Sequence, residues 1–130
     1  GDSDESRMKT ILIIDDDPSF NNVAGAALKE RGYTVSTATN GAEGLAAIKG
    51  SQPDALLLDV KMPGMSGIEV LRKLKAQMPD VHIPVIVVSN DSSLDTIGES
   101  VELGIRSYVL KAHESLSSIV DTVDRLFTKG

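Results

Sequence analysis

Polar side chains stand where four apolar runs of this sequence end. Asp15 and Asp16 end the first run, Asp59 the third, Ser89 the fourth and Lys111 the fifth. Carboxylates brought into one crevice repel each other unless a cation joins them, and oxygen ligands of this kind favour Mg²⁺ over a softer metal. A carboxylate that faces a metal and an ammonium is suited to phosphoryl transfer. The set therefore predicts a Mg²⁺-dependent site that accepts a phosphoryl group.

Each residue of the set has an expected role in that chemistry. Asp59 would be the in-line nucleophile and would become an aspartyl phosphate, with a charge of about −1.5 to −2. Lys111 would neutralise charge on the phosphoryl oxygens, and Ser89 would donate a hydrogen bond to one of them. The loop of residues 60–67 contains one proline and two glycines, and the backbone carbonyl of Lys61 could bind the metal. Ser89 or Lys111 alone would more often be structural, and Asp15 and Asp16 alone would be structural about as often as not, so the prediction rests on their coincidence.

Alternating strands and helices must position these residues. Strands are predicted at residues 10–15, 34–38, 55–59, 85–89 and 107–111. Three of them are nearly continuous runs of leucine or β-branched residues, as in parallel strands that are covered on both faces. Amphipathic segments follow each strand, the first behind Asp17 as N-cap and Pro18. Five such units predict an α/β fold, with a five-stranded parallel sheet and helices on both faces. Ligands bind at the carboxyl ends of the strands in such sheets.

Composition narrows the class of protein. A chain of 130 residues predicts one domain, at residues 9–128, after a disordered polar tail at residues 1–8. The absence of cysteine excludes disulfides and thiolate metal sites, and fits a cytoplasmic location. No apolar run approaches the roughly 20 residues of a membrane span. A net charge of −6, with two Phe, two Tyr and no Trp, argues against direct nucleic-acid binding.

Four motifs carry a resemblance to a known family. "ILIIDDDP", "LLLDVKMPGMSG", "PVIVVS" and "SYVLK" occur in the order and at the spacings typical of the receiver domain of two-component response regulators. The chain resembles that family from Lys9 to Phe127, which implies a flavodoxin-like (βα)5 fold. By this resemblance Asp59 is the phosphoacceptor, Asp16 a direct Mg²⁺ ligand and Asp15 a partner acid that holds the metal through water. Lys61 would offer its carbonyl to the same ion.

The resemblance also implies a switch and its partners. Ser89 and Lys111 resemble the switch hydroxyl and lysine, and Tyr108 the aromatic residue whose rotamer follows the state of the site. The phosphoryl donor would be a sensor histidine kinase or a histidine phosphotransfer protein, docked near Phe20 and Val23. Phosphorylation would remodel the surface of helix 94–101, strand 107–111 and helix 116–127, which could bind an output partner or a second copy. Such a domain promotes its own phosphorylation and dephosphorylation and turns over no separate substrate.

The sequence departs from the family pattern near the site. Ala112 replaces the usual proline after Lys111, so a trans peptide and a different path toward residue 115 are expected. Asn90 replaces a very small residue beside Ser89 and could crowd the entry of the phosphoryl group. Lys61 and Asp91 are expected to pair across the mouth of the site and to restrict the water that hydrolyses the phosphoryl group. These three residues, Lys61, Asn90 and Asp91, are candidates for setting the rate.

Two other functions remain open from the sequence. A receiver-like interaction module could work without phosphorylation, as the missing proline and Asn90 suggest. A small Mg²⁺-dependent phosphohydrolase of the haloacid-dehalogenase type would use Asp15 as nucleophile and Asp17 as acid. The chain is either a stand-alone receiver or a piece of a longer regulator or hybrid kinase.

Overall fold

Strands and helices alternate along the whole described part of the chain. The computed structural model describes residues 9–128, and the tail predicted at residues 1–8 lies outside them. Its elements are β1 (Thr10–Ile14), α1 (Pro18–Glu30), β2 (Thr34–Ala38), α2 (Gly41–Ser51), β3 (Ala55–Leu58), α3 (Gly67–Gln77), β4 (Val85–Ser89), α4 (Leu94–Glu102), β5 (Ser107–Leu110), the short 3-10 helix η2 (Lys111–His113) and α5 (Leu116–Phe127).

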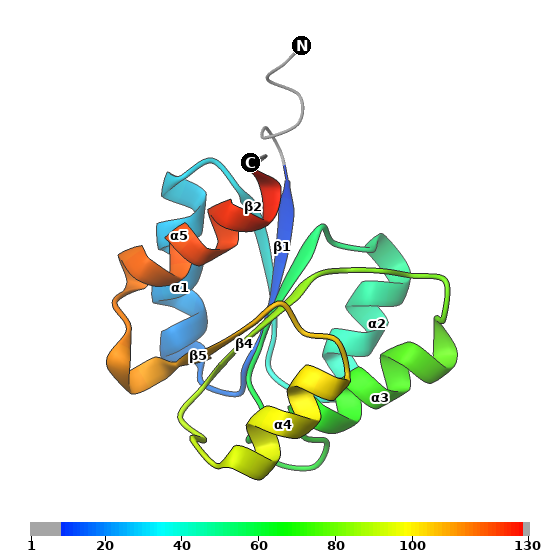
Figure 1. Cartoon of the computed structure of the whole chain (residues 1–130). Helices are drawn as coiled ribbons and strands as arrows, with labels where there is room; N and C mark the ends of the chain where they lie inside the picture. Colours follow the sequence, from blue (N-terminus) through cyan, green and yellow to red (C-terminus); the bar gives the residue numbers. More distant parts are fainter. Residues whose placement is uncertain (1–8, 129–130) are drawn as a thin grey trace.

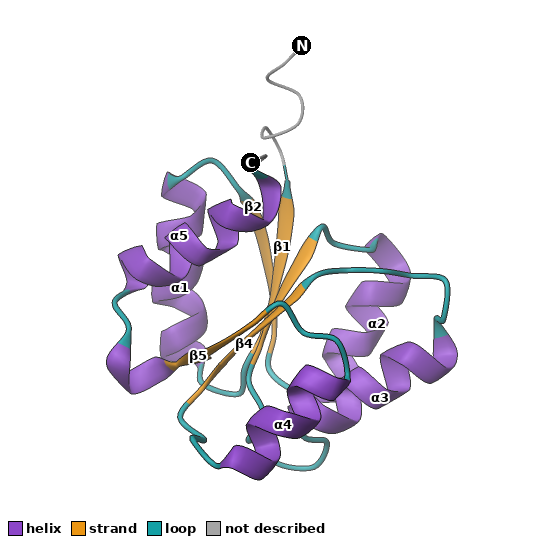
Figure 2. Ribbon diagram, viewed as in Figure 1, coloured by secondary structure: helices purple, strands orange, loops and turns teal. Residues whose placement is uncertain are grey.

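One parallel sheet forms the centre of the molecule. Its strand order is β2-β1-β3-β4-β5, and every neighbouring pair is parallel. Helices α1 and α5 cover one face, and α2, α3 and α4 cover the other (Figures 1 and 2). This arrangement confirms the predicted fold. Ile14 pairs with Leu58, and Leu58 with Val87, so the carboxyl ends of the central strands β1, β3 and β4 lie side by side.

The three central strands supply most of the core. Their side chains alternate between two layers, because successive residues of a strand point to opposite faces. Leu12, Ile14 and Leu58 pack in the layer under α2 and α3, while Ile11 and Ile13 pack in the layer under α1 and α5. All of these side chains are fully buried. The buried layers hold the strand ends, and hence the polar residues that follow them, in fixed positions.

Side-chain caps define where the helices begin. Asp17 caps α1 by accepting a hydrogen bond from the Ser19 amide, and Pro18 is the first helical residue, as predicted. Asn40 caps α2. Three serines that the sequence analysis did not single out cap the remaining α-helices of the described chain: Ser66 at α3, Ser93 at α4 and Ser115 at α5. These caps fix the loops that follow β3, β4 and η2.

The two ends of the described chain lie next to each other. The Lys9 ammonium lies 5.2 Å from the centroid of the Phe127 ring. Close by, the carboxylate of Asp124 accepts hydrogen bonds from the Tyr33 hydroxyl and the Arg31 guanidinium. The end of α5 therefore contacts both the residue before β1 and the end of α1.

None of the helices within residues 9–128 is both long and apolar enough to cross a membrane.

Candidate functional site

Three carboxylates meet at the carboxyl edge of the sheet. Asp15 and Asp16 follow β1 and Asp59 follows β3, whereas Asp15 and Asp59 were predicted to be the last residues of their strands. One oxygen from each of the three lies within 4.8 Å of the others. Asp15 and Asp59 are buried, whereas Asp16 is exposed to solvent. The acid cluster that the sequence predicts is therefore present.

Lys111 directly follows the edge strand β5, and its side chain reaches into this cluster. Its Nζ lies 2.7 Å from Asp15 Oδ2 and 3.7 Å from Asp59 Oδ2. The ammonium also lies 4.5 Å from the centroid of the Phe20 ring, close enough for a cation–π interaction. No cis peptide occurs in the described chain, and Lys111, Ala112 and His113 form the short helix η2. The expected trans bond is confirmed, and Lys111 is aimed by the acid cluster and an aromatic ring.

The charge balance of the cluster favours a cation. Burial and the neighbouring Asp15 carboxylate raise the pKa of Asp59, while Lys111, the Val60 amide and the Ser89 hydroxyl partly offset that rise. One ammonium faces three carboxylates, so the cluster retains excess negative charge. Carboxylate oxygens are the ligands that Mg²⁺ prefers. The donor set therefore fits Mg²⁺, with room for water at the exposed Asp16.

The loop after Asp59 is fixed by its backbone. Val60 donates its amide to Asp59 Oδ1 at 2.7 Å, and the Gly67 amide donates to the Val60 carbonyl at 2.8 Å. A Cβ at Gly67 would lie 2.2 Å from the carbonyl oxygen of Asp59, so only glycine fits there. The loop therefore closes tightly against the phosphoacceptor candidate. The Lys61 side chain is exposed on this loop.

Asp91 connects the buried hydroxyl of the site to α4 and β5. Its amide donates to Ser89 Oγ at 3.1 Å, and its carbonyl accepts a 2.6 Å hydrogen bond from the Tyr108 hydroxyl. Its carboxylate accepts from the Ser93 amide and the Thr96 hydroxyl in the first turn of α4. Those two residues, Ser93 first, hold the pKa of Asp91 below its usual value. Asp91 thus links Ser89 by hydrogen bonds both to Tyr108 and to the start of α4.

The predicted pairing of Lys61 with Asp91 is not found. Within residues 9–128 no Lys61 nitrogen lies within 4.0 Å of an Asp91 oxygen, the limit for an ion pair. The Asp91 carboxylate bonds instead to neighbours two and five residues away. Asn90 is exposed on the same loop. Electrostatic attraction from Lys61 still contributes to the low pKa of Asp91, as the weakest of the causes.

Two residues near the cluster were missed or given another role by the sequence analysis. Phe20 was expected only to help dock a donor, but its half-buried ring also contacts Lys111. Asn21 is buried, and its amide group donates to the backbone carbonyl of Asp15 at 2.9 Å. Both lie in the first turn of α1, directly behind the acid pair. An asparagine among apolar helix positions was the one local signal for its role.

Known proteins resemble this chain over almost its full length. A family model described as the response regulator receiver domain matches residues 11–124. Sporulation initiation phosphotransferase F of Bacillus subtilis (strain 168) is 36% identical over 115 residues, which cover 88% of this chain and 90% of that protein. The DNA-binding transcriptional regulator NtrC of Escherichia coli (strain K12) is also 36% identical over 115 residues, but the chain spans only 24% of its length. The structure of the Thermotoga maritima response regulator TrrA in complex with Mg(2+)-BeF has a TM-score of 0.79 and 30% identity, and covers 92% of this chain and 99% of that one.

Proposed function

The chain belongs to the response regulator receiver domain family, and we propose that its Asp59 accepts the phosphoryl group by which such domains signal. Receiver domains are signalling domains of two-component systems and receive their phosphoryl group from histidine kinases. The observation that carries the assignment of Asp59 is the geometry of its neighbours. Two further carboxylates lie within 4.8 Å of it, and the ammonium of Lys111 lies 3.7 Å from its Oδ2. Asp15 has the same neighbours, but its two oxygens already accept hydrogen bonds from the Asp17 amide at 2.9 Å and the Lys111 ammonium at 2.7 Å.

Mg²⁺ would be held by Asp15, Asp16, Asp59 and the carbonyl of Lys61. When bound, it offsets negative charge on the carboxylates and on the phosphoryl oxygens. The chain's own groups do the rest. A carboxylate oxygen of Asp59 attacks phosphorus as the phosphorus–nitrogen bond of the donor's phosphohistidine breaks, and the imidazole leaves with its electron pair. Lys111 shifts from the carboxylates toward the phosphoryl oxygens. Water later attacks phosphorus, which releases phosphate and restores the Asp59 carboxylate.

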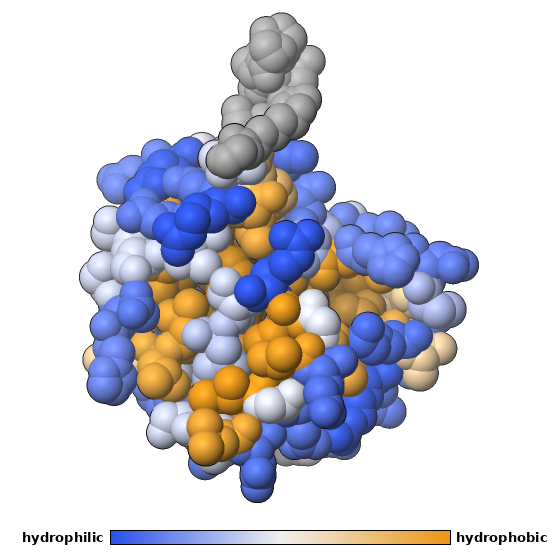
Figure 3. Space-filling view, viewed as in Figure 1, coloured by the Kyte–Doolittle hydropathy of each residue, from blue (hydrophilic) through white to orange (hydrophobic). Residues whose placement is uncertain are grey.

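Transmission to the surface is proposed to run through Asp91. Once the phosphoryl group is present, Ser89 donates its hydroxyl to a phosphoryl oxygen and the Asp91 loop follows. Because Asp91 binds both Tyr108 and the first turn of α4, the population shifts toward another packing of the face formed by α4, β5 and α5. Leu94 and Val101 on α4 are 84% and 60% exposed, and hydrophobic surface gathers in this region (Figure 3). An output partner or a second copy of the chain would bind there.

The donor is proposed to dock at the opposite side of the site. Val23 on α1 is half exposed, and the half-buried Phe20 lies one turn before it beside Lys111. Replacement of Val23 by Asp should slow transfer from a histidine kinase while leaving phosphorylation by acetyl phosphate unchanged. Equal slowing with both donors would exclude a docking role.

We place this exchange in the cytoplasm, and fractionation of cells that express the chain tests that location.

The decisive test of Asp59 is intact mass spectrometry after incubation with acetyl phosphate and Mg²⁺. We expect one added phosphoryl group on the native chain, and none on Asp59→Asn or in the presence of EDTA. Asp80→Asn, which changes an exposed acid far from the site, should label like the native chain. An adduct that persists on Asp59→Asn would show that another residue is the acceptor.

The residues at the mouth are proposed to set the lifetime of the aspartyl phosphate. Lys61 and Asn90 are exposed there, and Asp91 anchors the loop that follows Ser89. Replacement of Lys61 by Ala should speed hydrolysis by up to roughly fivefold, because an exposed charge contributes at most about 1 kcal/mol. The decay of the intact-mass adduct measures this, with Lys73→Ala as a remote lysine control. An unchanged half-life in Lys61→Ala would remove Lys61 from this role.

The two alternative functions, a haloacid-dehalogenase-type phosphohydrolase and a phosphorylation-independent interaction module, now have less support. Asp15 cannot serve as a free nucleophile of a phosphohydrolase, because its oxygens bind the Asp17 amide and the Lys111 ammonium. Asp17 is engaged as the N-cap of α1. A phosphorylation-independent module would show the same surface of α4, β5 and α5 with and without beryllofluoride, and amide chemical shifts would reveal it.

A further inference from the structure

One buried asparagine lies directly behind the acid pair. Asn21 is in the first turn of α1 and is only 4% exposed, on the helix face that also buries Ala24 and Leu28. Residues at this spacing share one side of a helix and pack on the sheet, so apolar side chains are expected there. Packing of α1 on the sheet therefore does not explain a polar side chain at this position.

The side-chain amide of Asn21 is only half satisfied. Its Nδ2 donates to the backbone carbonyl of Asp15 at 2.9 Å, but its Oδ1 is the one buried side-chain oxygen or nitrogen within residues 9–128 that has no hydrogen-bond partner in the protein. The reversed orientation would place Oδ1 against the Asp15 carbonyl oxygen, and two acceptors would repel each other. A typical hydrogen bond stabilises a fold by no more than an unpartnered buried polar group destabilises it. Stability of the fold therefore does not account for Asn21 either.

The carbonyl that Asn21 binds belongs to the peptide group between Asp15 and Asp16. On the other side of Asp16, the amide of Asp17 donates to Asp15 Oδ1 at 2.9 Å. Both peptide groups that flank Asp16 are therefore held by a side chain, one by Asn21 and the other by Asp15. The Asp16 side chain itself is exposed, so its direction is set by this backbone and not by packing.

The direction of the Asp16 carboxylate matters to a metal ion. One oxygen from each of Asp15, Asp16 and Asp59 lies within 4.8 Å of the others. Mg²⁺ requires a nearly ideal octahedron of oxygen ligands at about 2.0–2.1 Å, so a carboxylate that turns away from the cluster is lost as a ligand. Residues that orient a metal ligand from behind typically change the affinity for the metal about tenfold to hundredfold when they are replaced.

We propose that Asn21 is a positioning residue for Mg²⁺, which fixes the peptide group between Asp15 and Asp16 and thereby aims the Asp16 carboxylate at the ion. Asn21 acts through Asp16 and does not bind the ion itself. The inference rests on the proposed function, because it requires that the acid cluster binds Mg²⁺. It adds to that function a residue outside the cluster that sets how tightly the ion is held.

The first test is the dissociation constant for Mg²⁺ of the unphosphorylated full chain, measured from amide NMR shifts during a titration. Leucine has nearly the shape of asparagine but no donor, so Asn21→Leu should weaken binding roughly tenfold. Asn21→Ala removes the amide without filling its space and should weaken binding similarly. Asn22→Leu makes the same exchange at the next residue, which is exposed, and should bind Mg²⁺ like the native chain.

The second test needs no metal. ¹⁵N relaxation in EDTA reports the fast motion of each backbone amide, with order parameters of about 0.85 in rigid segments and below about 0.6 in flexible ones. The amides of Asp16 and Asp17 should be rigid in the native chain and in Asn22→Leu. In Asn21→Leu their order parameters should fall toward the flexible range, because one of the two bonds that hold Asp16 is gone.

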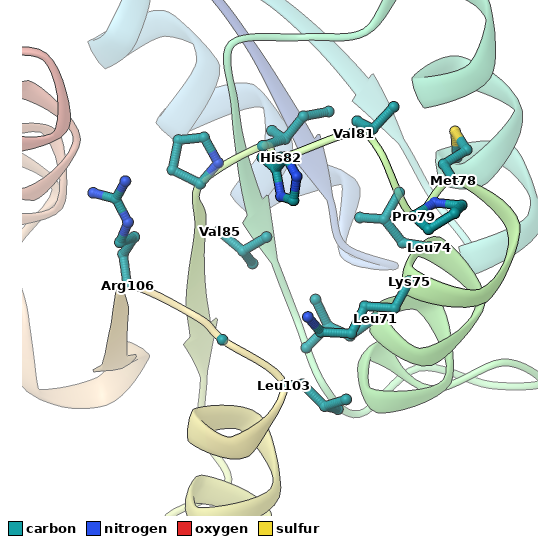
Figure 4. A pocket seen from close by; sticks show the side chains of 13 residues that line it. Leu71, Leu74, Lys75, Met78, Pro79, Val81, His82, Val85, Leu103 and Arg106 are labelled. Atoms are coloured by element: carbon teal, nitrogen blue, oxygen red, sulfur yellow. The ribbon is translucent and has the colours of Figure 1, made fainter.

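Leu74→Ala is the control for a general loss of stability. Leu74 is buried on α3 and lines a separate cavity before the amino ends of β4 and β5, at the edge of the sheet opposite to the acid cluster (Figure 4). Truncation of a buried leucine is strongly destabilising. In urea unfolding with EDTA, Leu74→Ala should lose at least as much stability as Asn21→Leu, but its affinity for Mg²⁺ should stay native.

The possible outcomes separate this inference from the proposed function. Equal Mg²⁺ dissociation constants for Asn21→Leu and the native chain would overturn the role of Asn21 and leave the magnesium site intact. An equal loss of affinity in Asn22→Leu or Leu74→Ala, unchanged order at Asp16, or failure of both Asn21 variants to fold would also overturn it. A native chain that binds no Mg²⁺ would contradict the proposed function, and this inference with it.

Discussion

Replacement of Lys111 by Met is expected to slow the phosphorylation of Asp59 by acetyl phosphate roughly hundredfold or more. Removing one preorganised donor to developing charge typically lowers a rate by about 10²–10³. Here the loss acts twice, because the same ammonium lies 2.7 Å from Asp15 and 3.7 Å from Asp59. Without it, the pKa of Asp59 rises further, because the ammonium is one of the groups that lower it.

The measurement is the initial rate of adduct formation by intact mass, at saturating Mg²⁺. Lys73→Met removes an exposed lysine on α3 and should leave the rate unchanged. Circular dichroism before and after the incubation establishes that both variants are folded. A rate for Lys111→Met within threefold of the native chain would mean that the ammonium does not assist the transfer.

Phe20→Leu separates the position of Lys111 from its charge. Leucine preserves an apolar side chain on α1 but removes the ring that lies 4.5 Å from the ammonium. A cation–π contact of this kind is worth about 0.5–2 kcal/mol, so we expect a rate reduced roughly threefold to thirtyfold. Phe20→Tyr should retain most of the native rate. If leucine and tyrosine gave the same rate, the ring would not be what holds Lys111.

Replacement of Gly67 by Ala is expected to lower the free energy of unfolding by about 3 kcal/mol. Overpacking of a filled site usually costs about 1–3 kcal/mol. The upper end applies here because the new Cβ would lie 2.2 Å from the Asp59 carbonyl oxygen and 2.9 Å from the Val60 Cα, and neither is a mobile side-chain end. The strain is relieved only if the loop behind Asp59 moves, so adduct formation should slow as well.

Gly50→Ala is the matched glycine substitution. A Cβ on Gly50 would meet no atom within 4 Å, and the residue lies inside α2. Alanine should stabilise the fold by about 0.5–1 kcal/mol, since glycine is the poorer helix residue. Urea unfolding of the native chain and both variants measures the differences. Equal stability of Gly67→Ala and the native chain would show that the loop adapts without strain.

The fold could be predicted because its central strands are nearly uninterrupted apolar runs. β1, β3 and β4 are buried along almost their whole length, which is the pattern that the sequence shows. The polar residues that follow them then had to share one edge of the sheet. Strand ends were less certain: β1, β3 and β5 end at Ile14, Leu58 and Leu110, one residue earlier than predicted, although the amides of Asp15 and Asp59 still donate to the neighbouring strand.

The contacts that sequence could not predict join distant segments or compete with local bonds. Phe20 and Lys111 are far apart in the chain, and no spacing rule brings them together. At Asp91 a long-range pair with Lys61 was expected, but bonds to Ser93 and Thr96 form instead. Partners two and five residues away need less ordering of the chain than a partner across the mouth of the site. Only the three-dimensional structure decides between such bonds.

The contact between Lys9 and Phe127 places the two ends of the domain next to each other. The polypeptide enters the sheet at β1 and leaves α5 at the same point, 5.2 Å apart from ammonium to ring. A domain whose two ends adjoin can be inserted into, or appended to, an unrelated protein with little strain on its host. The region that matches this chain makes up 90% of one relative and 24% of another. The contact between Lys9 and Phe127 thus favours the joining of this domain to other proteins, because the two connections to a host would start close together.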